Sequence, residues 1–380
     1  MRLLITAFVF MSLAAPAWAD AVVAPKCAQI LIQNPAAEAL LKQVAALKSR
    51  LDAVKNEVVR LGTGRQLTVQ SIKPATASDP VLLLMPGVNR ALLASDPTVT
   101  MLAAQGYGVM IFNLSPQPLS VATLAKNERP AFRDHKFELQ DLANEVQALA
   151  ERAKKDMGTD NVIPVSLSYT GAVSAHLKGF PLIFETVPMT SSAATNPKLE
   201  EYRQLLKSGE FFNPIFGPGI TRNMLDTAYR QQWSQQVETM TKQFNLPKER
   251  RDDMIEGYTV LSRATEGFAW NLKDLSPGTR RVFLLAGNEA PPLLRHQIDT
   301  FEALLKTRED ALAFLVLETG HVIPSERPEI YSAALKMVTS GSLPMKSGLV
   351  VIQPSTNETK MFPGAQAIEV LNKIREQLGK

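Results

Sequence analysis

Residues 161–177 read NVIPVSLSYTGAVSAHL, and the fold of the whole chain is best inferred by starting from them. The run 162–165 is short and apolar, which predicts a buried strand, and it stops abruptly before Ser168. The small residues that follow predict a helix. A sharp turn from strand to helix strains the residue at the turn, at a cost of about 1–3 kcal/mol. Such a turn needs small neighbours, which Ser166 and Thr170 supply, so Ser168 is a candidate functional residue.

The same alternation of apolar strand and helix recurs on both sides of this stretch. Fully apolar runs bounded by Pro or Gly are typical of central strands in a parallel sheet, which is buried on both faces. The strands predicted in this way are 81–85, 109–112, 162–165, 181–184, 282–286 and 311–317, with 66–72 as an edge strand. Helices are predicted at 99–105 and 137–153. This rhythm predicts parallel pairing with right-handed crossovers.

The strand, turn and helix around Ser168 resemble the nucleophile elbow of the α/β-hydrolases, whose usual form is Gly-x-Ser-x-Gly. Ser166 and Thr170 stand at the positions where glycines are commonest. The resemblance extends over residues 65–340. It implies an α/β fold: a doubly wound, mostly parallel sheet of α/β-hydrolase type with an inserted all-helical cap and an N-terminal amphipathic helix.

Changes in composition along the chain predict its domain organisation. We expect a signal peptide (1–19), an N-terminal coiled-coil-like helix (34–61), an α/β-hydrolase core in two parts (65–190 and 276–340), a helical cap (191–275) and a C-terminal extension (341–380). The aromatic and Met residues of the cap either line a substrate pocket or form the cap's own core. The extension contains a strand-like run at 349–352 and a predicted helix at 365–378, and we assign it no role.

Two residues after predicted strands complete a candidate catalytic set with Ser168. Glu289 closely follows Gly287 after the strand 282–286, and His321 follows Gly320 after the last strand. The order Ser, acid, His along the chain is the one that the resemblance implies. A serine hydroxyl is a weak nucleophile near neutral pH, so a histidine must accept its proton and a carboxylate must orient that histidine. Glu185 also ends a strand and is the alternative carboxylate.

The four histidines allow a comparison within the sequence. His135 lies in a charged loop, His176 on the helix after the turn, and His296 in a polar Arg-His-Gln run. His321 alone follows a buried strand behind a glycine. His321 is therefore the predicted catalytic histidine.

The resemblance also implies an oxyanion hole made of backbone N–H groups. One would come from Val88, in the turn after the strand 81–85, and the other from Tyr169, which follows the predicted nucleophile. Pro86 occupies the place of the histidine in the commoner His-Gly pair of this turn.

The N-terminal residues predict an exported protein. Residues 1–19 have Arg2, an apolar run and Ala17-Trp18-Ala19, which is the layout of a cleavable secretory signal. The apolar run is shorter than the about 20 residues that a membrane span needs, so we expect no integral membrane segment after processing and a periplasmic or secreted protein. Cys27 is the one cysteine, so no intramolecular disulfide can form.

Apolar residues repeat at spacings of four and three over 34–61, which is the pattern of a coiled coil. Three interpretations stay open for this helix. It joins two chains into a homodimer, lies as an amphipathic helix on the main domain, or pairs within a short helical hairpin.

Charge and residue spacing argue against several classes of protein. The net charge is +4 and the pI is about 9.0, but Lys and Arg are dispersed among acids, so nucleic acid is not an expected partner. No group of His, Cys, Asp and Glu has the spacing of metal ligands, so we expect neither a metal nor another cofactor.

These observations predict a serine hydrolase, carboxylesterase- or lipase-like, that cleaves a small-molecule carboxylic ester, or a thioester or amide, through an acyl-enzyme. Two alternatives remain. The protein could be a non-catalytic relative that binds a partner, or an acyltransferase that uses the same three residues.

Overall fold

The computed structural model describes residues 35–61, 65–87, 92–133, 137–168, 170–186, 204, 208, 218–219, 221–266, 280–289, 291–307, 310–343 and 345–378. The chain divides into two compact units, Met1–Ser49 and Arg50–Lys380. The described part of the first unit belongs to helix α3 (Pro35–Asp52). The expected signal peptide, 1–19, and Cys27 lie outside the described residues. Among the described helices, none is both long and apolar enough to cross a membrane.

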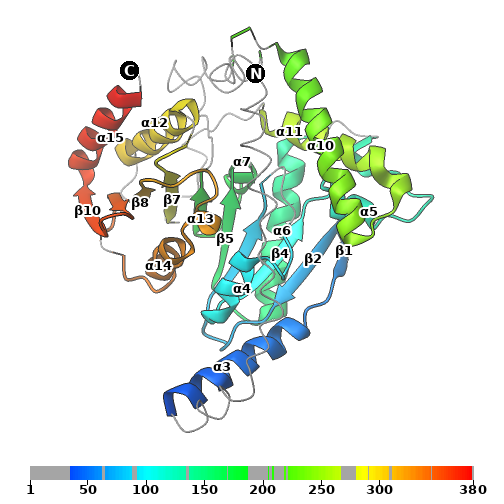
Figure 1. Ribbon diagram of the computed structural model, residues 1–380, viewed down its shortest axis with the longest axis horizontal. Helices are drawn as coiled ribbons and strands as arrows, with labels where there is room; N and C mark the ends of the chain where they lie inside the picture. Colours follow the sequence, from blue (N-terminus) through cyan, green and yellow to red (C-terminus); the bar gives the residue numbers. More distant parts are fainter. Residues whose placement is uncertain are drawn as a thin grey trace. The chain divides into compact units, whose positions relative to one another are not determined.

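The second unit is built on one ten-stranded sheet (Figure 1). Its strand order is β1-β2-β4-β3-β5-β6-β7-β8-β9-β10. Pairing is parallel from β4 through β9 in this order, and antiparallel for β1–β2, β2–β4 and β9–β10. The strands are β1 (Glu57–Arg60), β2 (Gln66–Ile72), β3 (Val81–Met85), β4 (Gly108–Asn113), β5 (Val162–Leu167), β6 (Leu182–Glu185), β7 (Arg281–Ala286), β8 (Ala311–Val316), β9 (Gly348–Gln353) and β10 (Glu358–Pro363). The predicted fold class, an α/β protein with a mostly parallel sheet, is confirmed.

Helices connect the parallel strands. In chain order, the described helices after β1 are α4 (Pro97–Ala104), α5 (Pro118–Ala122), α6 (Leu139–Met157), α7 (Thr170–Ser174), α10 (Arg222–Phe244), α11 (Arg251–Glu266), α12 (Pro291–Thr307), α13 (Ile323–Glu326), α14 (Pro328–Thr339) and α15 (Gly364–Leu378), of which α15 follows the last strand. Helix α4 begins after Asp96, whose side chain accepts a hydrogen bond from the Thr98 N–H, and it has Pro97 in its first turn. Helix α6 ends at Met157 and is followed by Gly158, which adopts the left-handed conformation common after helices.

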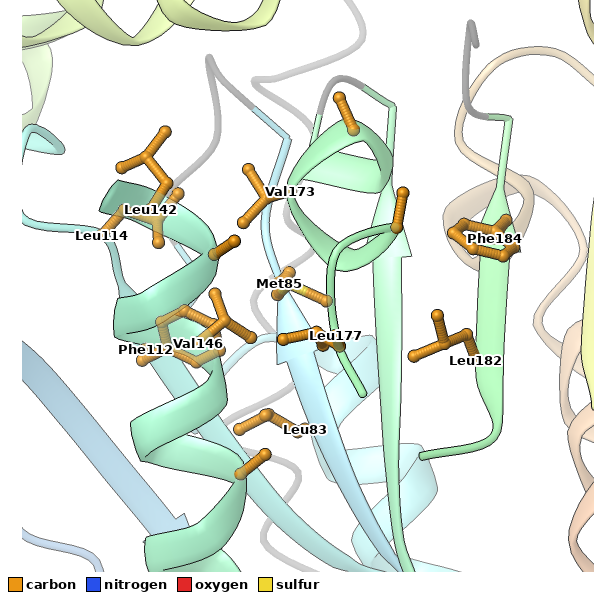
Figure 2. Packing of buried hydrophobic residues seen from close by; sticks show 14 of the residues in the cluster. Leu83, Met85, Phe112, Leu114, Leu142, Val146, Val173, Leu177, Leu182 and Phe184 are labelled. Atoms are coloured by element: carbon orange, nitrogen blue, oxygen red, sulfur yellow. The ribbon is translucent and has the colours of Figure 1, made fainter. Parts of the chain in front are cut away.

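The core explains why the central strands are apolar without alternation. All five residues of β3 are buried, because helices cover both faces of the sheet. Figure 2 shows one of these faces, where Leu83 and Met85 of β3 lie beside Leu142 and Val146 of α6. Leu82 and Leu84 alternate with them and are buried on the opposite face, because successive side chains of a strand point to opposite sides.

The N-terminal helix ends earlier than the sequence pattern predicts. The expected helix spans 34–61, whereas α3 ends at Asp52 and Glu57–Arg60 form strand β1. The prediction was therefore wrong for the end of this segment. The β-branched pair Val58-Val59 favours extended backbone, and β1 gains hydrogen bonds by pairing with β2. As a result, β2 is not the edge of the sheet.

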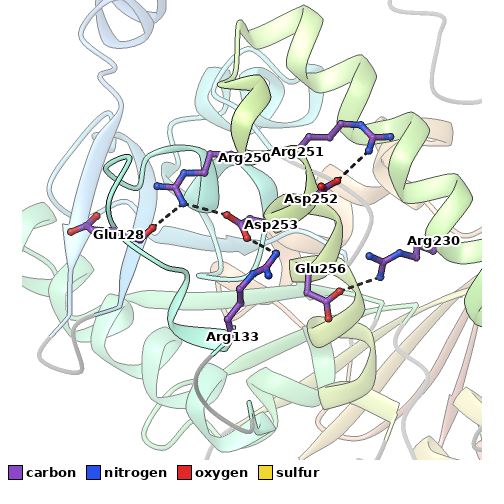
Figure 3. Close-up of polar contacts among 8 residues, drawn as sticks. All are labelled: Glu128, Arg133, Arg230, Arg250, Arg251, Asp252, Asp253 and Glu256. Carbon is purple, nitrogen blue, oxygen red and sulfur yellow. Dashed lines mark hydrogen bonds and ion pairs between the residues drawn. The ribbon is translucent and has the colours of Figure 1, made fainter.

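The described part of the predicted cap is helical and is fixed to the sheet domain through α11. Arg250 is buried and donates hydrogen bonds to the carbonyl oxygens of Glu128, at 2.8 Å, and Ala125. Asp253 on α11 accepts from Arg250 at 3.3 Å and also pairs with Arg133 at 2.6 Å (Figure 3). These contacts attach α11 to the segment 125–133 of the second unit.

Gly257 brings α11 against the chain that follows β4. A Cβ atom at this position would lie 1.9 Å from the carbonyl oxygen of Pro116, so a side chain there would force the two backbones apart. Apolar residues of α10 and α11, among them Trp233 and Tyr258, belong to the same hydrophobic cluster as the sheet.

The C-terminal residues complete the sheet. Strand β9 pairs in parallel with β8, from Leu312↔Gly348 to Val316↔Ile352, and β10 returns antiparallel beside it. Helix α15 packs on α12, where Arg375 forms ion pairs with Asp299, at 2.7 Å, and Glu302. Leu371 of α15 is fully buried in the main cluster.

Candidate active site

Ser168 lies in the turn between β5 and α7 and has a left-handed backbone, with φ of 55°. Its N–H donates a hydrogen bond of 2.9 Å to the carbonyl oxygen of Glu185, at the end of the neighbouring strand β6. Only 8% of Ser168 is exposed. A serine rarely adopts this conformation, so the surrounding contacts must impose it.

Hydroxyl side chains stabilise the turn at positions 166 and 170, where the α/β-hydrolases most often have glycine. The Thr170 hydroxyl accepts a hydrogen bond from the Leu167 N–H at 3.1 Å and donates to the Leu167 carbonyl at 2.8 Å. The Ser166 hydroxyl donates to the carbonyl oxygen of Ile183 at 3.2 Å and accepts from Ser174 at 2.9 Å. Both residues are fully buried, so a sharp turn is built here with small polar side chains instead of glycines.

The loops after β7 and β8 are joined by backbone hydrogen bonds. The Gly287 N–H donates to Val316 at 2.8 Å, and the Asn288 N–H donates to Thr319 at 2.9 Å. Gly287 is needed because a Cβ atom there would lie 2.8 Å from the Cα of Leu317. These bonds fix the spacing of the two loops that carry Glu289 and His321.

His321 and Glu289 are in direct contact. The Nδ1 atom of His321 is hydrogen-bonded to Oε2 of Glu289. Glu289 is buried, whereas 36% of the His321 side chain is exposed. A buried carboxylate on Nδ1 leaves Nε2 as the ring nitrogen that can exchange a proton with a substrate or a nucleophile.

The loop that carries His321 is also tied to the end of β6. The Thr186 hydroxyl donates a hydrogen bond of 2.8 Å to the carbonyl oxygen of His321. Thr186 directly follows Glu185, whose own carbonyl holds the Ser168 N–H. Residues 185–186 therefore connect the turn at Ser168 with the loop at His321.

Backbone strain is concentrated at this edge of the sheet. In the described part of the chain, five residues other than glycine have positive φ, and two of them are asparagines, which tolerate it. The other three are Ser168, Thr186 and Glu318, with φ of 55°, 44° and 58°. They follow the neighbouring strands β5 and β6 and the strand β8. Such strain clusters at functional sites, which supports a site at this edge.

Glu185, the alternative carboxylate, is buried beside a small cavity of about 30 Å³. The cavity is lined mainly by apolar side chains, among them Leu84, Val99, Leu167 and Pro324. No hydrogen bond between Glu185 and His321 is present among the described residues. The contact with His321 therefore favours Glu289 as the orienting acid.

The structure brings together only some of the predicted residues. Val88 and Tyr169, the predicted oxyanion-hole donors, lie outside the described residues, as does His135. His176 is exposed. His296, expected in a polar run, is fully buried on α12. Burial lowers the pKa of His296 to about 3, so it stays neutral.

Two residues of the site had no recognisable signal in the sequence. Thr186 and Glu318 act through contacts with segments far along the chain, and neither belongs to a known local motif. Among the described residues, no group of three or more His, Cys, Asp and Glu could hold a metal ion.

Comparisons with known proteins find similarity in solved structures. No protein-family model and no curated protein sequence match the chain. One similar structure comes from work on carboxylesterases of Nitrososphaera gargenis, with 12% identity, a TM-score of 0.48, and coverage of 76% of this chain and 100% of the other. Another is an α/β hydrolase enzyme from a Medee basin deep-sea metagenome library, with 12% identity, a TM-score of 0.49, and coverage of 76% and 98%.

A Pyrococcus furiosus esterase is similar at 12% identity and a TM-score of 0.48, over 76% of this chain and 90% of the other. Such distant likeness does not carry a reaction or a substrate to this chain. Function is therefore inferred from its own residues.

Proposed function

We propose that this protein is a serine hydrolase in which Ser168 is the nucleophile, His321 the general base and Glu289 the orienting acid. The observation that carries the proposal is the strained turn at Ser168, tied through residues 185–186 to the loop where His321 contacts Glu289. Strain, a buried carboxylate and a histidine converge at one edge of the sheet, where α/β proteins place their ligands.

The proposed reaction has two steps. The Ser168 hydroxyl attacks the carbonyl carbon of an ester as His321 accepts the hydroxyl proton, and His321 then gives this proton to the departing alcohol. Water, deprotonated by His321, next attacks the acyl-enzyme, the bond to the Ser168 oxygen breaks, and His321 returns the proton to that oxygen as the acid is released. Glu289 stabilises the imidazolium cation in both steps. The backbone N–H groups of Val88 and Tyr169 are the proposed donors to the developing oxyanion.

A carboxylic ester is the preferred substrate class, with a thioester or an amide as alternatives. We further propose that the protein is exported by the signal at 1–19, and that the N-terminal helix joins two chains into a homodimer. Sizing of the mature protein with and without residues 20–49 tests the dimer.

Covalent labelling tests the proposed nucleophile. The mature protein is treated with a fluorophosphonate and analysed by mass spectrometry beside Ser168→Ala, His321→Ala and Glu289→Gln variants. We expect one adduct, on Ser168, absent from the first variant and formed much more slowly in the other two. Ser342→Ala, which removes an exposed hydroxyl, is the control and should label like the wild type.

Two results would redirect the proposal. Absence of an adduct on demonstrably folded wild-type protein would favour a non-catalytic binding protein. Labelling of Ser168 together with product formation that exceeds hydrolysis when an alcohol or amine acceptor is added would favour an acyltransferase.

A further inference from the structure

The turn between β9 and β10 meets the loop that carries His321. Strand β9 is parallel to β8, so the turn at its end lies at the same edge of the sheet as the candidate active site. In that turn, the Ser355 N–H donates to Oε2 of Glu318 at 3.0 Å, and the Ser355 hydroxyl donates to Oε1 at 2.7 Å. Glu318 precedes His321 in the loop after β8. We propose that the C-terminal hairpin positions His321 by holding Glu318, which makes Glu318 a positioning residue for the proposed reaction.

The contact uses the whole carboxylate. Both oxygens of Glu318 accept hydrogen bonds from Ser355, and Gln353 of β9 adds a longer one of 3.5 Å. These bonds, with the Ser355 hydroxyl as the largest contribution and the nearby Arg327 cation as a smaller one, lower the pKa of Glu318. The folded protein therefore favours the charged carboxylate that the contact needs.

The backbone conformation of Glu318 is unfavourable for glutamate, which indicates that the side-chain carboxylate is needed at this position. With φ of 58°, the position would suit glycine or asparagine better than glutamate. A glycine would relieve the strain but would have no carboxylate to offer Ser355. The strained glutamate is explained if the carboxylate itself is needed.

Every residue from Glu318 to His321 is held by a separate hydrogen bond. The Thr319 carbonyl accepts from the Asn288 N–H, and the Gly320 N–H donates to Oε2 of Glu326 at 2.7 Å. The His321 carbonyl accepts from Thr186. Glu318 supplies the side-chain attachment to the C-terminal hairpin, beside the 2.9 Å backbone bond from the Leu317 N–H to the Ile352 carbonyl, so its loss loosens the start of the loop while the other bonds remain. His321 should then shift against Glu289 without unfolding of the protein.

The test compares the full mature wild type with Glu318→Gln, Glu318→Gly, Ser355→Ala and Ser355→Thr variants. Glu358→Gln is the matched control, because Glu358 lies on the same hairpin and pairs with Lys360 at 3.4 Å instead of with the loop. The first readout is the rate of fluorophosphonate labelling of Ser168 as a function of pH. The second is the downfield proton NMR signal of the His321 ring N–H bonded to Glu289, assigned with His321→Ala.

We expect labelling to slow about tenfold or more in Glu318→Gln and Glu318→Gly, because small misplacement of a catalytic group is costly. Their His321 signal should broaden or vanish, while circular dichroism and the melting temperature stay close to those of the wild type. Ser355→Ala should also slow labelling and broaden the His321 signal. Ser355→Thr, which keeps the hydroxyl, and Glu358→Gln should behave like the wild type.

The two readouts separate this proposal from the hydrolase proposal on which it rests. Labelling and His321 signals that are unchanged in both Glu318 variants would overturn the positioning role and leave the hydrolase intact. A wild type that does not label, but whose His321 signal is lost in the Glu318 variants, would uphold the positioning role and count against the hydrolase. A His321 signal that persists in those variants of an unreactive protein would overturn both.

Discussion

The backbone conformation of Ser168 is strained for any residue that has a side chain. Its φ of 55° lies in the region where a Cβ atom crowds the following carbonyl, at a cost of roughly 1–2 kcal/mol. The neighbouring hydroxyls of Ser166 and Thr170 hold the turn in spite of this cost. Two variants that both remove the Ser168 hydroxyl should therefore differ in stability.

Ser168→Gly should be more stable than Ser168→Ala by up to about 1 kcal/mol, because glycine relieves the strain but gains freedom in the unfolded chain. Urea unfolding followed by circular dichroism measures the difference. A Ser168→Gly variant that unfolds at a lower urea concentration than Ser168→Ala would show that the turn is not strained in solution.

Thr170 contributes a hydroxyl that serves as both donor and acceptor within the turn. Thr170→Val keeps the shape but leaves the N–H and the carbonyl of Leu167 without this partner, which should lower the free energy of unfolding by about 1–3 kcal/mol. Thr170→Ser retains the hydroxyl and is the matched control. If the two variants unfold at the same urea concentration, the hydroxyl does not close the turn.

At the scale of elements, helix α6 is joined to the end of β4 by a buried acid. Glu145 of α6 accepts hydrogen bonds from the Ser115 hydroxyl, at 2.5 Å, and the Ser115 N–H, at 3.1 Å. Arg65 lies 3.6 Å from it and 2.9 Å from Asp141. Burial is the largest influence and raises the pKa of Glu145 to about 7.

A raised pKa means that the folded protein binds this proton more tightly than the unfolded chain does. The resulting stability is complete below the ordinary value of 4.5 and is lost as the pH rises through about 7. We expect Glu145 to account for a fall of up to about 3 kcal/mol over this range.

Urea unfolding at several pH values tests this expectation. Glu145→Gln should remove this part of the pH dependence, whereas Glu151→Gln, exposed on the same helix, should preserve it. A Glu145→Gln variant with the pH dependence of the wild type would contradict the assignment.

Elements also show where sequence patterns succeed and where they fail. The strands β3, β5, β7 and β8 could be predicted because each contains an apolar run, and Glu289 and His321 because each closely follows such a run and a glycine. Strand β1 was missed because Val58 fits both a helical repeat and a strand, and pairing with β2 decides between them. The contact of Ser355 with Glu318 could not be predicted, because it joins segments that only the folded sheet brings together.

At the scale of the whole molecule, one hydrophobic cluster extends from the helices of the insertion to the C-terminal helix. Trp233 on α10 and Leu371 on α15 both belong to it. The chain from Arg50 to Lys380 also forms one compact unit. We therefore expect a destabilising substitution in α15 to unfold the cap helices α10 and α11 together with the sheet.

Leu371→Ala should destabilise the protein by about 2–5 kcal/mol, because Leu371 is fully buried. Trp233 fluorescence, measured in a Trp270→Phe background, and circular dichroism should shift together along the urea axis. Glu369→Ala, exposed on the same helix, should leave both signals unchanged. Fluorescence and circular dichroism transitions that separate would show that the insertion unfolds on its own.

Because Ser355 lies near the C-terminus, its hydrogen bonds to Glu318 can form only after nearly the whole chain has been translated. The ribosome makes Ser168 long before it makes the hairpin that holds the loop of His321. A chain released early, or cleaved within its last strands, would carry the proposed nucleophile together with a poorly held His321. If the proposed reaction is correct, Ser168 would react more slowly until the hairpin has been made, and full reactivity would report that the polypeptide had been completed.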